Sequence, residues 1–135
     1  MKRLIVVVLA VALSVAIGSA ALAAKGGGTT HVKSKVKINY QTSGTPPYDE
    51  GSSFFGKVKS KSGPNKARKA CKKHRKVKVT PDVGKAKTDK KGKWQIFLDH
   101  AAAPGTYTAK AKKKKIKKHH TKIVCKKAKK SLTIS

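Results

Sequence analysis

The sequence predicts an all-β protein, a small antiparallel sandwich of about seven short strands behind an N-terminal signal helix. Three observations support this fold class. Apolar and polar residues alternate in short runs, which is the period of a half-buried strand. Turn-forming Gly, Pro and Asp residues separate those runs. After the signal segment no long amphipathic helix pattern competes, and the best helix candidate, residues 65–73, would form only one or two turns.

The first 23 residues have the three parts of a secretory signal peptide. They begin with Lys2 and Arg3, continue with an apolar run over residues 4–13, and end in Ala21-Leu22-Ala23. We therefore expect cleavage after Ala23 and a secreted or cell-surface protein. An uncleaved anchor is the alternative, since about 20 residues can span a bilayer. Residues 24–31, with three consecutive glycines, are expected to be a flexible lead to a single domain over residues 32–135.

The alternating runs follow that lead in order. They predict strands at residues 32–40, 54–59, 75–79, 84–88, 94–98, 106–111 and 132–134. Residues 43–51 are predicted to form a loop, and residues 60–70 are predicted to form a basic loop. Asp89-Lys90-Lys91-Gly92 reads as a turn, because Asp can bond its own backbone and Gly can take a positive φ. Pro104 and Gly105 mark another turn. Trp94, the only Trp, is expected to anchor the core, with Tyr107 packed on it.

Two cysteines, Cys71 and Cys125, are expected to form one disulfide, because export favours oxidation and their number is even. The bridge would close a loop of about 55 residues and stabilise the fold by on the order of 4 kcal/mol. A metal site is the alternative. Its ligands would come from Cys71, His74, His119, His120 and Cys125.

Several short motifs resemble the carboxypeptidase regulatory-like, transthyretin-like modules of secreted bacterial proteins. The first is a G-x-V motif at Gly56 and Val58. The second is a T-D-x-x-G-x-aromatic motif formed by Thr88, Asp89, Gly92 and Trp94. The third is a P-G-x-Y motif formed by Pro104, Gly105 and Tyr107. The resemblance spans about residues 53–111. It implies an Ig-like or prealbumin-like sandwich that is non-catalytic and serves as a spacer or binding module. The Lys-rich loops and the two cysteines depart from the family pattern.

Positive charge dominates the composition: 34 Lys and Arg stand against 5 Asp and Glu, for a net charge of +29. Charge of this density attracts polyanions. Lys is a hydrated point charge without the bidentate geometry of Arg, so base-specific readout is not expected. A solvated, solubility-giving surface is the plainer interpretation. The candidate polyanion-binding residues are Lys72, Lys73, Arg75, Lys76, Lys112, Lys113, Lys114, Lys115, Lys117, Lys118, Lys126, Lys127, Lys129 and Lys130.

The sequence offers little material for catalysis. It has no G-x-S-x-G, H-E-x-x-H, Walker-type or G-x-G-x-x-G motif. The adjacent Asp49 and Glu50 fit a solvated turn better than an acid–base pair. We therefore expect no enzyme activity, no cofactor and no small-molecule substrate.

We expect a structural or adhesive module that docks electrostatically on anionic polymers of the cell envelope. Two alternatives remain open. One is a partly disordered polycation that binds nucleic acid or anionic membranes without sequence specificity, since only 17 of the 112 residues after Ala23 are Leu, Ile, Val or Phe. The other is an export protein that binds metal through the Cys and His set named above.

Overall fold

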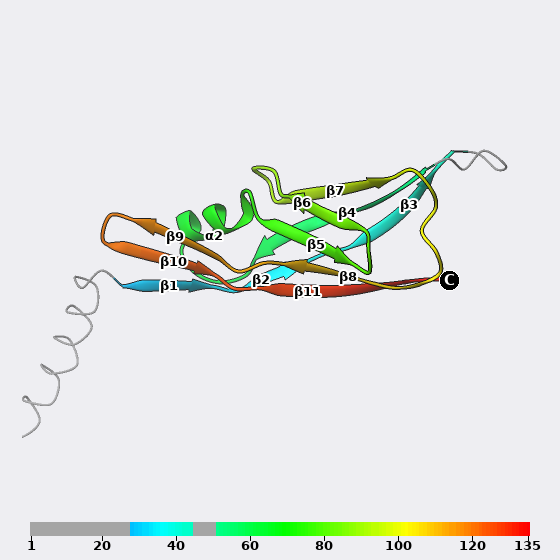
Figure 1. Cartoon of the computed structure of the whole chain (residues 1–135). Helices are drawn as coiled ribbons and strands as arrows, with labels where there is room; N and C mark the ends of the chain where they lie inside the picture. The colour runs from blue at the N-terminus through cyan, green and yellow to red at the C-terminus, as the bar shows by residue number, and fades with distance from the viewer. Residues whose placement is uncertain (1–27, 45–50) are drawn as a thin grey trace, which may run out of the picture.

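A computed structural model describes residues 28–44 and 51–135 (Figure 1). The predicted signal peptide, residues 24–27 of the predicted lead and most of the predicted loop over residues 43–51 lie outside the described residues. Within the described ranges the chain forms eleven strands and one short helix, which confirms the all-β prediction. No helix there is both long enough and apolar enough to cross a membrane.

Most strands coincide with the predicted alternating runs. The elements are β1 (Thr29–Val32), β2 (Ser34–Val36), β3 (Asn39–Ser43), β4 (Gly51–Ser60), α2 (Asn65–Lys72), β5 (Lys76–Thr80), β6 (Gly84–Lys87), β7 (Lys93–Leu98), β8 (Gly105–Ala111), β9 (Lys114–Lys118), β10 (Thr121–Cys125) and β11 (Ala128–Ile134). The hairpin of β9 and β10 and the strand β1 have no counterpart among the predicted strands. Residues 29–31 are therefore paired in a sheet, and the predicted flexible lead is wrong for them.

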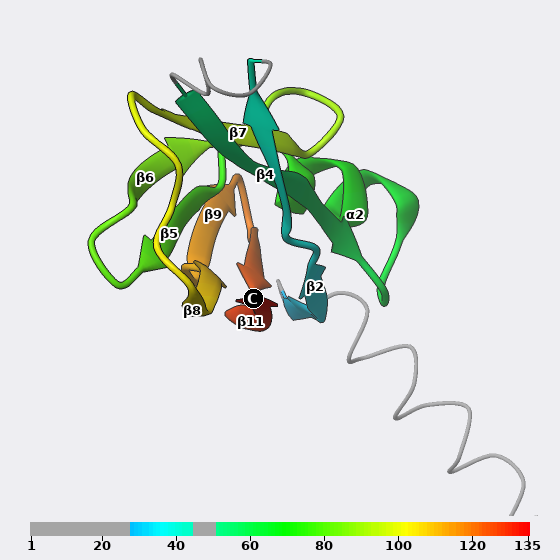
Figure 2. The same ribbon diagram turned by 90° about the vertical axis from the view of Figure 1, so that its right-hand side faces the viewer.

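Two sheets form the layers of the sandwich (Figure 2). In one, β4 pairs with β2 and β3 on one side and with β7 on the other. The other has the strand order β11-β8-β5-β6. A third, smaller sheet, β1-β10-β9, extends from one end and packs beside α2 (Figure 1).

The predicted first strand is interrupted rather than continuous. From Ser34 to Ser43 the chain keeps one register along β4, with Val36 opposite Val58 and Asn39 opposite Phe55. The regular strand breaks between β2 and β3, where the backbone of Lys37 lies against Gly56. A Cβ at Gly56 would stand 1.8 Å from the Lys37 carbonyl oxygen, so only glycine allows this approach.

The core lies between the two layers and is made of the inward residues of each strand. Phe54 is its centre, with the rings of Tyr40 and Tyr107 at centroid distances of 4.9 and 4.8 Å. Val58, Val77 and their neighbours on both sheets complete it. The predicted interior positions of Trp94 and Tyr107 are confirmed, since both are buried.

The burial of Trp94 gives a direct optical prediction. Its indole is 3% exposed in the folded protein, so its emission is expected to be blue-shifted and shielded from an aqueous quencher. Unfolding in denaturant is expected to shift the emission to the red and to open it to the quencher. Emission of the folded protein that is already red-shifted and fully quenchable would contradict this packing.

The T-D-x-x-G motif forms the predicted turn before β7. The Asp89 carboxylate accepts hydrogen bonds from the amides of Lys91 and Lys93 at 2.8 and 2.9 Å. These bonds, chiefly the one from Lys93, lower the pKa of Asp89. Gly92 has φ +87°, and a Cβ there would meet the Val58 carbonyl oxygen at 2.5 Å. The turn residues of the motif therefore have structural roles.

Thr88, the first residue of that motif, joins β6 to the end of α2. Its buried hydroxyl donates to the Lys72 carbonyl and accepts a hydrogen bond from the Arg75 amide at 2.8 Å. The backbones of Thr88 and Arg75 are also bonded to each other. These contacts hold the segment between α2 and β5 in place.

The predicted disulfide is confirmed: Cys71 on α2 is bonded to Cys125 at the end of β10, with their Cα atoms 5.5 Å apart. Both sulfurs are buried in a small second core with Val32 and Ala67. Because the two sulfurs are bonded to each other, the alternative of a metal site built on these cysteines is wrong. In residues 28–44 and 51–135 there is also no group of three or more His, Cys, Asp or Glu residues placed to hold a metal ion.

Candidate polyanion-binding face

A long hairpin ribbon supplies half of the candidate site. Its strands are β8 followed by β9, and β10 followed by β11. The register is the same on both sides of the joint, with Ala111 opposite Ala128 and Lys114 opposite Cys125. Only two residues on each strand separate these pairs, and there the ladder is interrupted. The amide of Lys112 donates to the Lys76 carbonyl, and the amide of Lys126 donates to the Val32 carbonyl.

The Arg75 side chain occupies this interruption. It is fully buried, and its Nε and Nη2 donate to the Lys112 carbonyl at 3.1 and 2.8 Å. Nη2 also donates to the Lys126 carbonyl at 2.9 Å, so the guanidinium bridges the two strands of the ribbon. Nη1 donates to the Cys71 carbonyl and to the Ser34 hydroxyl. All five N–H donors are used, and all of these acceptors are uncharged.

Arg75 is therefore a structural residue, and its prediction as a polyanion-binding residue is wrong. Its side chain is 0% exposed and has no N–H left for a ligand. Burial of the guanidinium lowers the pKa of Arg75. Uncharged carbonyl oxygens take the place of a carboxylate partner in stabilising the charge.

The outer face of the sheet β11-β8-β5-β6 carries a regular set of lysines, which we call the lysine array. It arises because every second residue of a strand points outward. In row 1, directly paired positions follow one another across all four strands: Lys85 opposite Lys78, Lys78 opposite Lys110, and Lys110 opposite Lys129.

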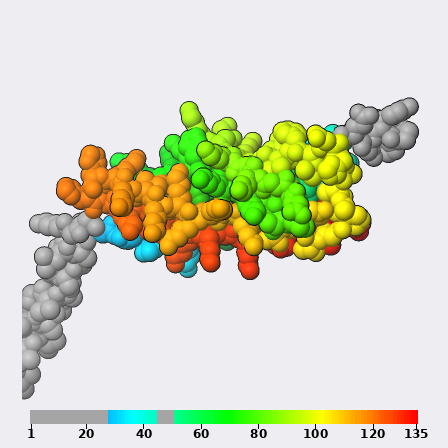
Figure 3. Space-filling view, in the orientation of Figure 1, coloured from blue at the N-terminus to red at the C-terminus, as the bar shows by residue number. Residues whose placement is uncertain are grey.

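Row 2 lies two residues further along each strand. Lys87 is opposite Lys76, and the Lys112 amide is bonded to the Lys76 carbonyl. Lys127 and Lys112 each lie one position beyond the pair Ala111 and Ala128, and both line the same hollow. All eight side chains of the array are exposed. In Figure 3 the segments that carry the array are green for β5 and β6, yellow to orange for β8, and orange-red for β11.

Two shallow hollows lie between the rows. The first, of about 320 Å³, is lined by Lys76, Lys87 and Lys112 of row 2 and by Lys78 and Lys85 of row 1. The second, of about 620 Å³, is lined by array lysines of β5, β8 and β11 together with Lys113. Lys78 and Lys112 line both hollows, which are therefore adjacent.

Apart from the buried Arg75, the predicted basic residues divide among five places. Lys76, Lys112, Lys127 and Lys129 belong to the array. Lys114, Lys115, Lys117 and Lys118 lie on β9, while Lys72 and Lys73 lie at the end of α2. Lys113 and Lys126 lie at the interruption of the ribbon. Lys130, on β11, is opposite Ala109 and is exposed. The structure therefore brings together four of the fourteen candidates and distributes the others.

Sequence reasoning missed the other half of the array, Lys78, Lys85, Lys87 and Lys110. These lysines do not lie in the long basic runs. The signal that could have found them is the alternation itself, K-V-K-V in β5, G-K-A-K in β6 and A-K-A in β8, which places Lys on the outward side of neighbouring strands.

The β9–β10 hairpin is a second basic region. Lys117 is opposite Lys122, and His119 forms the turn with φ +48°. Lys114 is half-buried, and its ammonium donates to the Lys73 carbonyl at 2.8 Å. Burial first, and the charge of Arg75 second, lower the pKa of Lys114. This lysine therefore ties the hairpin to the end of α2.

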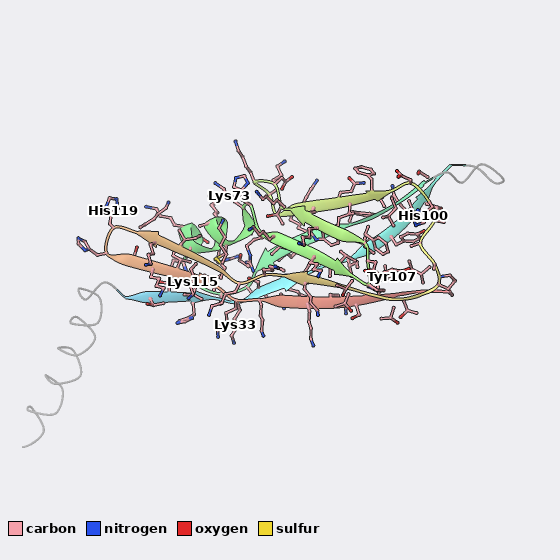
Figure 4. All side chains as sticks on the ribbon, in the orientation of Figure 1. Lys33, Lys73, His100, Tyr107, Lys115 and His119 are labelled. Atoms are coloured by element: carbon pink, nitrogen blue, oxygen red, sulfur yellow. A yellow bond between two sulfur atoms is a disulfide. The ribbon has the colours of Figure 1, made fainter. Side chains whose placement is uncertain are left out.

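The histidines described here do not gather at one place on the molecule. His119 is at the tip of the hairpin and His100 is at the opposite end of the molecule (Figure 4). His74 lies with five lysines around another hollow, of about 400 Å³.

Three comparisons with known proteins returned no match for this chain among family models, curated proteins or solved structures.

Proposed function

We propose that the protein is a secreted, non-enzymatic β-sandwich that docks on anionic polymers of the cell envelope through the lysine array. The observation that carries the proposal is the row of directly paired lysines, Lys85, Lys78, Lys110 and Lys129. Like charges placed directly opposite each other destabilise a sheet. Repulsion between lysines paired in this way across four strands lowers the stability of the fold, and a bound polyanion would offset that repulsion.

The chemistry of the array favours recognition of a polyanion by its charge and not by a base sequence. All eight residues are lysines, which bind phosphates as point charges. The two hollows between the rows are lined only by Lys, Val and Ala, so no aromatic ring offers a stacking platform for bases there. Binding is then driven by counterion release and weakens steeply with salt.

The test replaces row 1 by neutral residues: Lys78, Lys85, Lys110 and Lys129 all become Gln. We expect log affinity for an isolated glycerol-phosphate wall polymer to fall linearly with log salt in the unaltered protein. In the variant, that slope is expected to flatten by about 3, since each lost contact contributes about 0.7 for a single chain. The melting temperature is expected to stay the same or rise, because repulsion between paired lysines is relieved.

A matched control removes the same charge from elsewhere. Lys59, Lys61, Lys66 and Lys69 are exposed and lie on β4, on α2 and on the loop between them. In Figure 2, α2 lies on the side of the molecule opposite β6. Their replacement by Gln is expected to change the slope by less than 1. Equal losses in the two variants, or affinity that does not depend on salt, would contradict docking through the array.

We also infer that the sandwich is of the Ig-like, carboxypeptidase regulatory-like kind. Three features of the motif residues support this inference. Gly56 permits a close backbone approach, Asp89 closes the turn before Trp94, and the Tyr107 hydroxyl donates to the Ala103 carbonyl at 2.7 Å. A tyrosine bonded to the backbone a few residues upstream is typical of Ig-like sandwiches.

A further inference from the structure

We propose that the lysine array accepts a single flexible anionic chain, lying across the strands between the two lysine rows, in preference to a stiff duplex or a flat anionic surface. This inference rests on the proposed function and specifies its ligand as a linear polyphosphate or phosphodiester chain. The two hollows carry it, because each is lined by lysines from both rows.

The hollows form a channel with charged walls and an uncharged floor. Val77 and Ala86 line the first hollow, and Ala111 and Ala128 line the second. These four residues pack into or against the core, so the floor consists mainly of their backbone. A chain in the channel would therefore meet ammonium groups on both sides.

The dimensions suit one chain. The rows are two residues apart along each strand, or about 7 Å. Four strands place the first and last lysine of a row about 14 Å apart. A single chain can lie between walls of this spacing with charge on either side. A duplex is too wide to enter and would contact the outer ends of the lysines only.

Sheet twist also discriminates between ligands. Neighbouring strands turn by about 20–25°, so the channel rotates by roughly 60–75° over its length. A flexible chain can follow this path. Duplex DNA is stiff over about 50 nm and cannot bend within 14 Å without a large cost. A flat anionic surface would reach only part of the twisted rows.

The experiment compares two DNA ligands of equal length, single-stranded oligo-dT and a mixed-sequence duplex. A simple positive surface prefers the duplex, because the duplex has the higher charge density and releases more counterions per contact. The channel predicts the opposite order. We expect the protein to bind oligo-dT about tenfold more tightly than the duplex at the same salt concentration.

Variants of the two rows test the walls separately. Row 1 becomes Gln at Lys78, Lys85, Lys110 and Lys129, and row 2 becomes Gln at Lys76, Lys87, Lys112 and Lys127. Each change is expected to abolish the preference for oligo-dT, because a channel needs both walls. The control at Lys59, Lys61, Lys66 and Lys69 is expected to retain it. Circular dichroism of each variant shows whether its β structure is intact.

The outcomes separate this inference from the proposed function. Tighter binding of the duplex, with a salt slope that still depends on the array, would overturn the channel and leave polyanion docking in place. If either row variant still binds oligo-dT more tightly than the duplex, the channel inference is also overturned. Equal loss of oligo-dT binding in the array variants and in the control would overturn both proposals.

Discussion

Reduction of the Cys71–Cys125 disulfide is expected to lower the free energy of unfolding by about 4 kcal/mol. The bond joins residues 54 positions apart, and a loop of that length restricts the unfolded chain by about this amount. For a domain of this size the melting temperature is expected to fall by about 20 °C. Thermal unfolding with and without reductant, followed by circular dichroism, measures the change.

The location of the bond adds a local effect. It holds α2 to β10, and Cys71 also accepts a hydrogen bond from Arg75 through its carbonyl. Loss of the bond therefore frees one of the acceptors that fix the guanidinium. The double variant Cys71→Ala with Cys125→Ala is expected to match the reduced protein. Two reactive thiols in the unreduced protein, or a melting temperature that does not change when reductant is added, would contradict a stabilising Cys71–Cys125 disulfide.

Alternation made most of the sandwich predictable. In β5, β7 and β8, apolar residues occupy every second position and fill the core, and a two-residue period is visible in sequence. The helix beside Cys71 and the turn at Asp89 also follow from local residue chemistry. These are the elements in which short-range pattern and tertiary packing agree.

The β9–β10 hairpin could not be predicted in the same way. Lysines fill most of β9, where Ile116 is the one apolar residue, and in β10 the apolar residues Ile123, Val124 and Cys125 are consecutive rather than alternating. The strands form because the ribbon that begins with β8 and β11 continues through them in one register. Pairing between distant segments therefore overrides weak local preference there.

The lysine array shows why runs of charge in sequence are a poor guide to charge in space. Neighbouring residues of a strand point to opposite faces, so a run such as Lys112–Lys115 cannot form one patch on a flat sheet. Lysines separated by one residue share a face, and pairing then places them beside lysines of other strands. Lys78 and Lys110 are 32 positions apart in sequence but directly opposite each other in the sheet.

Arg75 shows that the burial of a charged residue also cannot be predicted from its local sequence. It stands between His74 and Lys76 in a basic run, and nothing in that local pattern distinguishes it from a solvated residue. Its burial results from the interruption of the ribbon, where the carbonyls of Lys112 and Lys126 need donors. That requirement arises only when three distant segments meet.

Replacement of Arg75 by Met is expected to cost at least about 3 kcal/mol of unfolding free energy. Met keeps an unbranched apolar side chain but has no donor, so the carbonyls of Cys71, Lys112 and Lys126 lose their bonds to the guanidinium. A buried acceptor left without a partner costs about 1–3 kcal/mol. Removal of a buried positive charge from a chain of net charge +29 relieves some repulsion, but five charge-assisted bonds outweigh it.

Two further variants show which property of Arg75 matters. Arg75→Lys keeps the charge but supplies only three donors from one nitrogen, so it is expected to recover part of the loss. Arg68→Met is the matched control, because the half-buried Arg68 has a buried Nε without a hydrogen-bond partner; a cost below about 1 kcal/mol is expected. Denaturant unfolding measures the stability of all three variants.

Hydrogen exchange at the amides of Lys112 and Lys126 is expected to become faster in Arg75→Met, through local opening that precedes global unfolding, because the guanidinium bridges the two strands of the ribbon at that point. A stability of Arg75→Met equal to that of Arg68→Met would show that the ribbon holds together without the guanidinium.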